Sequence, residues 1–275
     1  MTTTTSRHPR TFVSSDGTEI GVFSSGEGPP LLLVHGSLGD HTRWDALRPH
    51  LEPHWRVHAM DRRGRGASGD ANEYAIARET EDVVAVVEGL AAEAGTDVDV
   101  YCSSYGGLCA FTAPAHTARI RQLALYEAWP APDPAAFATP DDVLRQIETL
   151  LAAGDREGML TLAYRALAGV DENELERIRA QPSWPNRVAA AHTVPREVRA
   201  FEAYAFDPQE AARIRVPTLL LVGSESDVWR RDVDTVATAL PDARVVEMPG
   251  QGHAADLLAP EVVAANLIEH LRHER

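Results

Sequence analysis

Short apolar runs recur along the chain, and each is followed by turn residues and then by a helical pattern. Because the runs lack strict alternation of polar and apolar positions, they predict strands covered on both faces of a parallel sheet. The predicted strands span residues 30–36, 55–61, 98–103, 120–127, 217–223 and 243–250.

Two earlier segments predict an antiparallel hairpin. Residues 11–14 and 19–24 flank Asp16-Gly17, a pair typical of tight hairpin turns. Apolar residues at helical spacing predict helices over 79–94, 106–116 and 260–272, with Gly95 as a stop signal for the first. Alternation of strands and helices predicts an α/β fold with a doubly wound sheet.

One region breaks this alternation. Between residues 130 and 206 we expect no strand, and helical patterns occupy 141–153, 156–168, 172–180 and 187–204. Prolines gather where this region opens and near its close. We therefore predict a helical insertion between two strands of the sheet.

The composition narrows the class of function. Of 275 residues, 44% are hydrophobic and 24% are charged, which is ordinary for a soluble globular protein. The formal net charge of −15 argues against binding to nucleic acid or to anionic lipid, since both need Lys and Arg.

The location is predicted from two further features. The polar start of the chain lacks the apolar core of a signal peptide, and no segment approaches a membrane span. Cys102 and Cys109 are expected to be buried free thiols, as in a reducing compartment. We expect a cytoplasmic protein that is flexible over residues 1–9.

The segment Cys102-Ser103-Ser104-Tyr105-Gly106-Gly107 follows a predicted strand and opens a predicted helix. A sharp strand-to-helix turn strains the residue at its apex and needs small neighbours. The apex hydroxyl then points out at the carboxyl edge of the sheet, beside the helix N-terminus. An alternative interpretation is a serine that only caps the helix.

This segment resembles the G-x-S-x-G nucleophile elbow of the α/β-hydrolase family, with Cys102 in place of the first glycine. The register selects Ser104, rather than Ser103, as the nucleophile. The resemblance implies a mostly parallel eight-stranded sheet with a core over 10–129 and 207–275 and a helical cap over 130–206. It points to the esterase and haloperoxidase-like branch of serine hydrolases.

The family's catalytic base is a late histidine. The segment 248–253 follows the last predicted strand and resembles the family's histidine loop, which makes His253 the candidate base. The family usually places the orienting acid after the preceding strand, where Asp227 is our choice and Glu225 an alternative. Glu127, which ends the strand after the elbow helix, is the rival, because some relatives carry their acid there.

The oxyanion hole needs backbone N–H groups. Residues 35–39 follow a predicted strand and resemble the family's oxyanion loop, which implies the N–H groups of Ser37 and Tyr105, with Leu38 as the alternative to Ser37. His35 is expected to hold this loop. The Arg- and Gly-rich segment 61–69 matches no phosphate-binding fingerprint and is interpreted as a structural turn.

The predicted cap would roof the site, and large side chains in and near it are candidates for the substrate pocket. These candidates are His41, Trp44, Trp129, Phe137, Leu144, Tyr164, Trp184 and His192.

These motifs predict a serine hydrolase that cleaves an ester or lactone of a small, hydrophobic substrate through an acyl-enzyme, without metal or organic cofactor. The alternatives on the same fold are a C–C bond hydrolase or cofactor-free haloperoxidase-like enzyme, a biosynthetic lyase or cyclase, and a slow small-molecule sensor. We expect a monomer or homodimer with a small-molecule substrate, and neither nucleic acid nor membrane as partner.

Overall fold

The computed structural model of the protein describes residues 8–133, 135 and 138–271. Its centre is an eight-stranded sheet of order β1-β2-β4-β3-β5-β6-β7-β8, in which the β1–β2 and β2–β4 pairs are antiparallel and all other pairs are parallel. The predicted sheet is therefore confirmed. The strands are β1 (Arg10–Val13), β2 (Glu19–Ser25), β3 (Pro30–Val34), β4 (Arg56–Met60), β5 (Val98–Ser103), β6 (Ile120–Tyr126), β7 (Thr218–Gly223) and β8 (Ala243–Met248).

The central strands are apolar on both sides because each face of the sheet packs against helices. In β3, Leu32 and Val34 belong to one buried cluster, whereas Leu31 and Leu33 belong to the cluster on the opposite face. Alternate side chains of a strand point to opposite faces, so an unbroken apolar run supplies both clusters at once.

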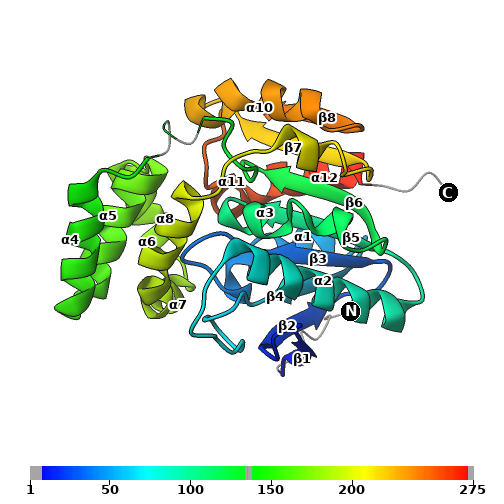
Figure 1. The fold of residues 1–275 in the computed structure, drawn as a ribbon, viewed down its shortest axis with the longest axis horizontal. Helices are drawn as coiled ribbons and strands as arrows, with labels where there is room; N and C mark the ends of the chain where they lie inside the picture. Colours follow the sequence, from blue (N-terminus) through cyan, green and yellow to red (C-terminus); the bar gives the residue numbers. More distant parts are fainter. Residues whose placement is uncertain (1–7, 134, 136–137, 272–275) are drawn as a thin grey trace.

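Helices cover both faces of the sheet (Figure 1). One apolar cluster includes side chains of α2 (Ile76–Ala94), α3 (Tyr105–Ala110) and α10 (Asp227–Ala239). The other includes side chains of α1 (Arg48–Leu51), α11 (Ala255–Leu258) and α12 (Pro260–His270). Gly95 ends α2 with a φ of 67°, as the stop signal predicts.

Between β6 and β7 the described residues contain helices and no strand, as predicted. Figure 1 shows α4 to α8 standing together at one side of the sheet. The helices of this segment are α4 (Asp141–Ala152), α5 (Arg156–Ala168), α6 (Glu172–Arg179), α7 (Trp184–Ala190), η4 (Ala191–Thr193), α8 (Val194–Glu202) and α9 (Pro208–Ala211). Their apolar cluster includes Leu38, Ala254 and Leu257 of the sheet domain, so the two parts meet at the loops of the site.

The single helix predicted over 187–204 is wrong. The chain instead forms α7, the turn η4 and α8, with Pro195 in the first turn of α8. Proline lacks an N–H and its ring clashes with the carbonyl four residues earlier, so it starts a new helix rather than continuing the old one.

Other predicted helices differ at their ends or were not foreseen. The helix predicted over 106–116 is α3 followed by the short turn η2 (Ala113–Ala115). The predicted last residue of the final helix, Arg272, lies outside the described residues. The sequence pattern did not reveal η1 (His41–Trp44), α1, α9, α10 or α11.

Cys102 and Cys109 are buried and free, as predicted. The residues predicted to form a flexible N-terminus fall mostly within 1–7, outside the described part, and the boundaries of core and cap at 129/130 and 206/207 stay a prediction. In the part of the chain that the structure describes, no helix has the length and apolar character needed to cross a membrane.

Candidate active site

Ser104 stands at the sharp turn between β5 and α3. Its φ of 54° and ψ of −133° are strained for a residue with a side chain. The turn is tight because glycines follow it: a Cβ on Gly106 would lie 2.4 Å from the Val34 carbonyl oxygen, and one on Gly107 would lie 1.9 Å from that of Ala128. The predicted elbow is thus present as a backbone geometry, with Cys102 buried in β5 at the position of the family's first glycine.

His253 lies on the loop between β8 and α11 and faces Ser104. Its Nε2 is 3.0 Å from Ser104 Oγ. The imidazole is stacked on the Trp229 indole, with ring centroids 5.7 Å apart and planes 3° from parallel. This packing holds the ring in the orientation that the contact with Ser104 requires.

The carboxylate that meets His253 is Glu127, at the end of β6. Its Oε2 lies 2.5 Å from His253 Nδ1, and its Oε1 accepts the Gly223 N–H at 2.8 Å. Glu127 is completely buried and has a φ of 45°, so the backbone is strained here as well. With both carboxylate oxygens occupied, the side chain is held in one position. The Glu127 carboxylate favours the His253 tautomer in which Nδ1 carries the proton and Nε2 is free to accept one.

The preference for Asp227 is not supported by its position. Asp227 is the first residue of α10, its side chain is 94% exposed, and its carboxylate lies 3.7 Å from Arg230. Glu225 is exposed and accepts a hydrogen bond from the neighbouring Ser224 hydroxyl at 2.9 Å. The structure brings Glu127, the rival candidate, to the imidazole instead of either of them.

The loop predicted to form the oxyanion hole runs beside Ser104. A Cβ on Gly36 would lie 2.8 Å from Ser104 Cβ, so only glycine permits this approach. Ser37 and Leu38 follow it and line the same cavity as Ser104 and Tyr105. Tyr105 is the first residue of α3, where a helix has no internal acceptor for the N–H group.

His35 holds this loop, as expected. Its Nδ1 donates to the Gly36 carbonyl at 2.8 Å, and its Nε2 accepts the Arg62 N–H at 3.1 Å. Burial, together with the charges of Arg62 and Arg65, keeps the pKa of His35 well below its usual value. The ring is therefore neutral and structural, with both nitrogens occupied.

A cavity of about 670 Å³ lies between the helical segment and the sheet domain, and Ser104 and His253 line it. Several charged side chains also reach it. These are Arg43, Asp171, Glu174, Arg187, Glu197, Glu225 and Asp227. Charged residues of the helical segment, such as Arg187 and Glu197, were not foreseen, because helical spacing does not reveal which polar residue is buried.

Among the described residues that line this cavity, Tyr164 is the one candidate that prediction and structure share. His41, Trp44, Trp129, Trp184, His192 and Leu144 are absent from that lining, and Phe137 lies outside the described residues. The aromatic candidates fill cores instead: Trp44 packs edge-on against Tyr101 at 5.6 Å and Trp129 against Trp229 at 5.3 Å.

The remaining pocket candidates are also engaged elsewhere. Trp184 stacks on Tyr164, with centroids 6.3 Å apart, and His192 is exposed with its Nδ1 3.0 Å from the Ala189 carbonyl. Leu144 packs against the apolar cluster of the helical segment. Aromatic size alone therefore predicts burial more reliably than contact with a ligand.

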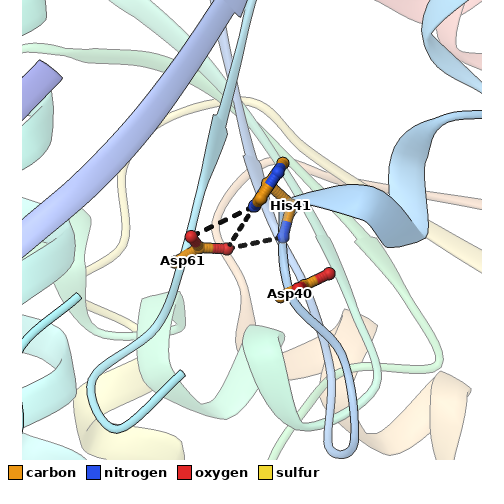
Figure 2. A group of neighbouring side chains, drawn as sticks. All are labelled: Asp40, His41 and Asp61. Carbon is orange, nitrogen blue, oxygen red and sulfur yellow. Dashed lines mark hydrogen bonds and ion pairs between the residues drawn. The ribbon is translucent and has the colours of Figure 1, made fainter. Parts of the chain in front are cut away.

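His41 contributes to a second polar cluster, with Asp40 and Asp61 (Figure 2). Asp61 accepts from the His41 N–H at 2.6 Å, from the His41 ring at 2.9 Å and from the Ala67 N–H at 2.8 Å. Burial opposes a charged His41 ring, but the hydrogen bond to Asp61 and nearby carboxylates outweigh it and raise its pKa. Because these donors already occupy the Asp61 carboxylate, we interpret the cluster as one that stabilises the turn over 61–69.

This turn gives a stability prediction. Gly66 has a φ of 52°, and a Cβ there would lie 2.1 Å from Asp61 Oδ2, whereas Gly95 has a φ of 67° and nothing within 4 Å. We expect Gly95→Ala to lower the free energy of unfolding by about 1 kcal/mol through backbone strain alone. Gly66→Ala adds a steric clash and should cost about 1–3 kcal/mol more. Urea-induced unfolding measures both, and equal losses would contradict the proposed role of Asp61.

Known proteins resemble this chain over most of its length. "Putative carbamate hydrolase RutD" of Azorhizobium caulinodans is 28% identical over 255 residues, which cover 86% of this chain and 89% of that protein. The non-heme haloperoxidase of Rhodococcus erythropolis is 26% identical over 94% of this chain and 97% of its own. The crystal structure of an alpha/beta hydrolase from Sphaerobacter thermophilus matches with a TM-score of 0.81 and 33% identity, over 96% of this chain and 100% of that one.

The sequence model of the alpha/beta hydrolase family matches residues 31–266, which include the elbow, the oxyanion loop, the helical segment and the histidine loop. Together with the eight-stranded sheet, this match confirms the resemblance seen in the sequence. The chain belongs to the alpha/beta hydrolase family.

Proposed function

We propose that the protein hydrolyses a carboxylic ester or lactone through an acyl-enzyme on Ser104, with His253 as the base and Glu127 as the orienting acid. The observation that carries the proposal is the continuous chain of contacts from Ser104 Oγ through the imidazole to the Glu127 carboxylate. Hydroxyl, imidazole and buried carboxylate in this order are the arrangement that activates a serine nucleophile.

In the first half-reaction, Ser104 Oγ attacks the carbonyl carbon while His253 Nε2 takes the hydroxyl proton. The negative charge that develops on the carbonyl oxygen is stabilised by the N–H of Tyr105 and by that of Ser37 or Leu38. The tetrahedral intermediate then collapses, and His253 returns the proton to the departing alcohol.

In the second half-reaction, His253 takes a proton from water as the water oxygen attacks the acyl carbon. The ester bond to Ser104 breaks, the proton returns to Oγ, and the carboxylic acid leaves. The buried carboxylate of Glu127 stabilises the imidazolium in both halves. We infer that the helical segment acts as a cap that shields these steps from bulk water.

The test is a rapid-mixing experiment with p-nitrophenyl butanoate. An acyl-enzyme predicts a burst of p-nitrophenol close to one equivalent per active site, or a mass increase of the protein by the butanoyl group after acid quenching. Hydrolysis that leaves no acyl group on the serine peptide under any quench would contradict the covalent route.

A second candidate is a cofactor-free haloperoxidase-like activity, favoured by the relative of that name in Rhodococcus erythropolis. In this route a peroxyacid forms when hydrogen peroxide, rather than water, attacks the acyl-enzyme, and the peroxyacid then oxidises halide. Bromination of an activated diketone in acetate buffer that contains bromide and hydrogen peroxide would support it, provided that Ser104→Ala abolishes the reaction.

A further inference from the structure

Arg187 of α7 lines the cavity and is 1% exposed. Its Nη1 donates to the Tyr164 hydroxyl at 2.9 Å, but its Nε and Nη2 are buried and have no hydrogen-bond partner. Within the described part of the chain no carboxylate pairs with it. A buried cation with unmade hydrogen bonds is costly, and it suits a site where a ligand supplies the missing acceptors.

The other buried arginines show which partners a buried guanidinium has elsewhere in this protein. Each of those in the described part of the chain is paired with at least one carboxylate, and three direct the edge formed by Nε and Nη2 at both oxygens of a single acid. Those three pairs are Arg43–Asp256, Arg62–Glu79 and Arg63–Asp82. The same edge is the one left without partners on Arg187.

The geometry of a guanidinium explains why this edge is informative. Two parallel N–H groups match the two oxygens of a carboxylate, which makes the pair stronger and more directional than a single hydrogen bond. Tyr164 fixes the opposite side of the Arg187 guanidinium and is itself stacked on Trp184. The side chain is therefore ordered before a ligand enters.

The acidic side chains that line the cavity do not bind the Nε and Nη2 edge of Arg187 in the structure. Arg62 and Arg65 both contact Glu197 Oε1 at 2.6 Å, while Glu197 Oε2 is buried and makes no hydrogen bond, to Arg187 or to any other group. The carboxylate of Asp227 lies 3.7 Å from Arg230.

We propose that Arg187 binds a free carboxylate of the substrate, so that the enzyme acts on esters that carry a second, ionised carboxyl group. This inference rests on the proposed ester hydrolysis at Ser104, since both side chains line one cavity. It replaces the expectation of a small, hydrophobic substrate by a class that includes half-esters of dicarboxylic acids.

The substrate test compares matched esters on the wild-type enzyme. Monoethyl adipate and ethyl hexanoate differ by a terminal carboxylate in the acyl part, and butanoyl glycolate and ethyl butanoate differ by one in the alcohol part. We expect kcat/KM to be about 10- to 100-fold higher for the anionic ester of at least one pair, mainly through KM. Equal values, or a preference for the neutral ester in both pairs, would overturn the inference.

The variant test follows the ratio of kcat/KM for the anionic over the neutral ester. Arg187→Gln should lower this ratio at least about tenfold, with the neutral ester measured on the same protein to correct for any general loss. Arg165→Gln is the matched control, because Arg165 lies on α5, is exposed and pairs with Glu172 at the surface. A ratio that Arg187→Gln leaves unchanged would overturn the inference.

A binding experiment separates this inference from the proposed function. Calorimetric titration of adipate, which is not an ester, should show binding to the wild-type protein that Arg187→Gln weakens at least about tenfold. If adipate binds in this way but no ester is cleaved, the proposed function fails and the carboxylate site stands. If ethyl hexanoate is cleaved but adipate binds neither protein, the site is wrong and the function stands.

Discussion

Replacing Ser104 with alanine is expected to lower kcat for ester hydrolysis by roughly 10⁴- to 10⁶-fold, because the variant lacks the hydroxyl that is proposed to form the acyl-enzyme. The fold should not change, since the alanine methyl occupies the Cβ position that Ser104 already has at the elbow. Steady-state hydrolysis of p-nitrophenyl butanoate, with the circular dichroism spectrum of the variant, measures the effect.

Ser103 offers a matched control for this variant. It is the preceding residue, completely buried in β5, and its Oγ has no hydrogen-bond partner. Ser103→Ala should therefore keep kcat within about threefold of the wild type, as expected for removal of an unpaired buried hydroxyl. If the Ser104→Ala enzyme retained more than a tenth of wild-type turnover, Ser104 would not be the nucleophile.

Changing Glu127 to glutamine is expected to lower kcat by about 10³- to 10⁴-fold. The amide keeps the size of the side chain, but it no longer stabilises an imidazolium and can hold the ring in the wrong tautomer. The variant loses charge at a completely buried position next to His253, so the effect should appear in kcat rather than in KM.

Asp227→Asn and Glu225→Gln are the controls, because both carboxylates were sequence-based candidates for the same role. Both residues are exposed, so each variant should keep kcat within about twofold. If Asp227→Asn lost activity and Glu127→Gln did not, Glu127 would not be the orienting acid.

The fold and two members of the proposed site could be predicted because their signals are local. An apolar run followed by turn residues fixes where a strand ends, and the glycines after Ser104 reveal the turn that presents it. His253 follows the last strand closely, so its place at the edge of the sheet depends on little else. The chain order of these segments then predicts that they meet.

The sequence alone does not decide whether Glu127 or Asp227 meets the imidazole. Glu127 and Asp227 follow β6 and β7, which are neighbours in the sheet, so both could reach the same edge. Two structural details separate them. The backbone of Glu127 turns to a φ of 45° and directs its carboxylate to His253, whereas Asp227 already belongs to α10, a helix that the pattern did not reveal.

Most of the predicted pocket residues do not line the cavity, and packing again explains the difference. Trp44 and Trp129 are large apolar side chains, and the packing of the cores buried them away from the cavity. The burial of Arg187 could not be predicted, because an arginine in an amphipathic helix is expected to face solvent. Only the packing of α7 against α5 places it inside.

Reaction with a fluorophosphonate probe, followed by mass mapping of the labelled peptide, tests the central claim most directly. An activated serine predicts one label per chain, carried by Ser104, absent from Ser104→Ala and much slower to form in His253→Ala. Label on a different serine, or no label on a folded protein, would contradict the account.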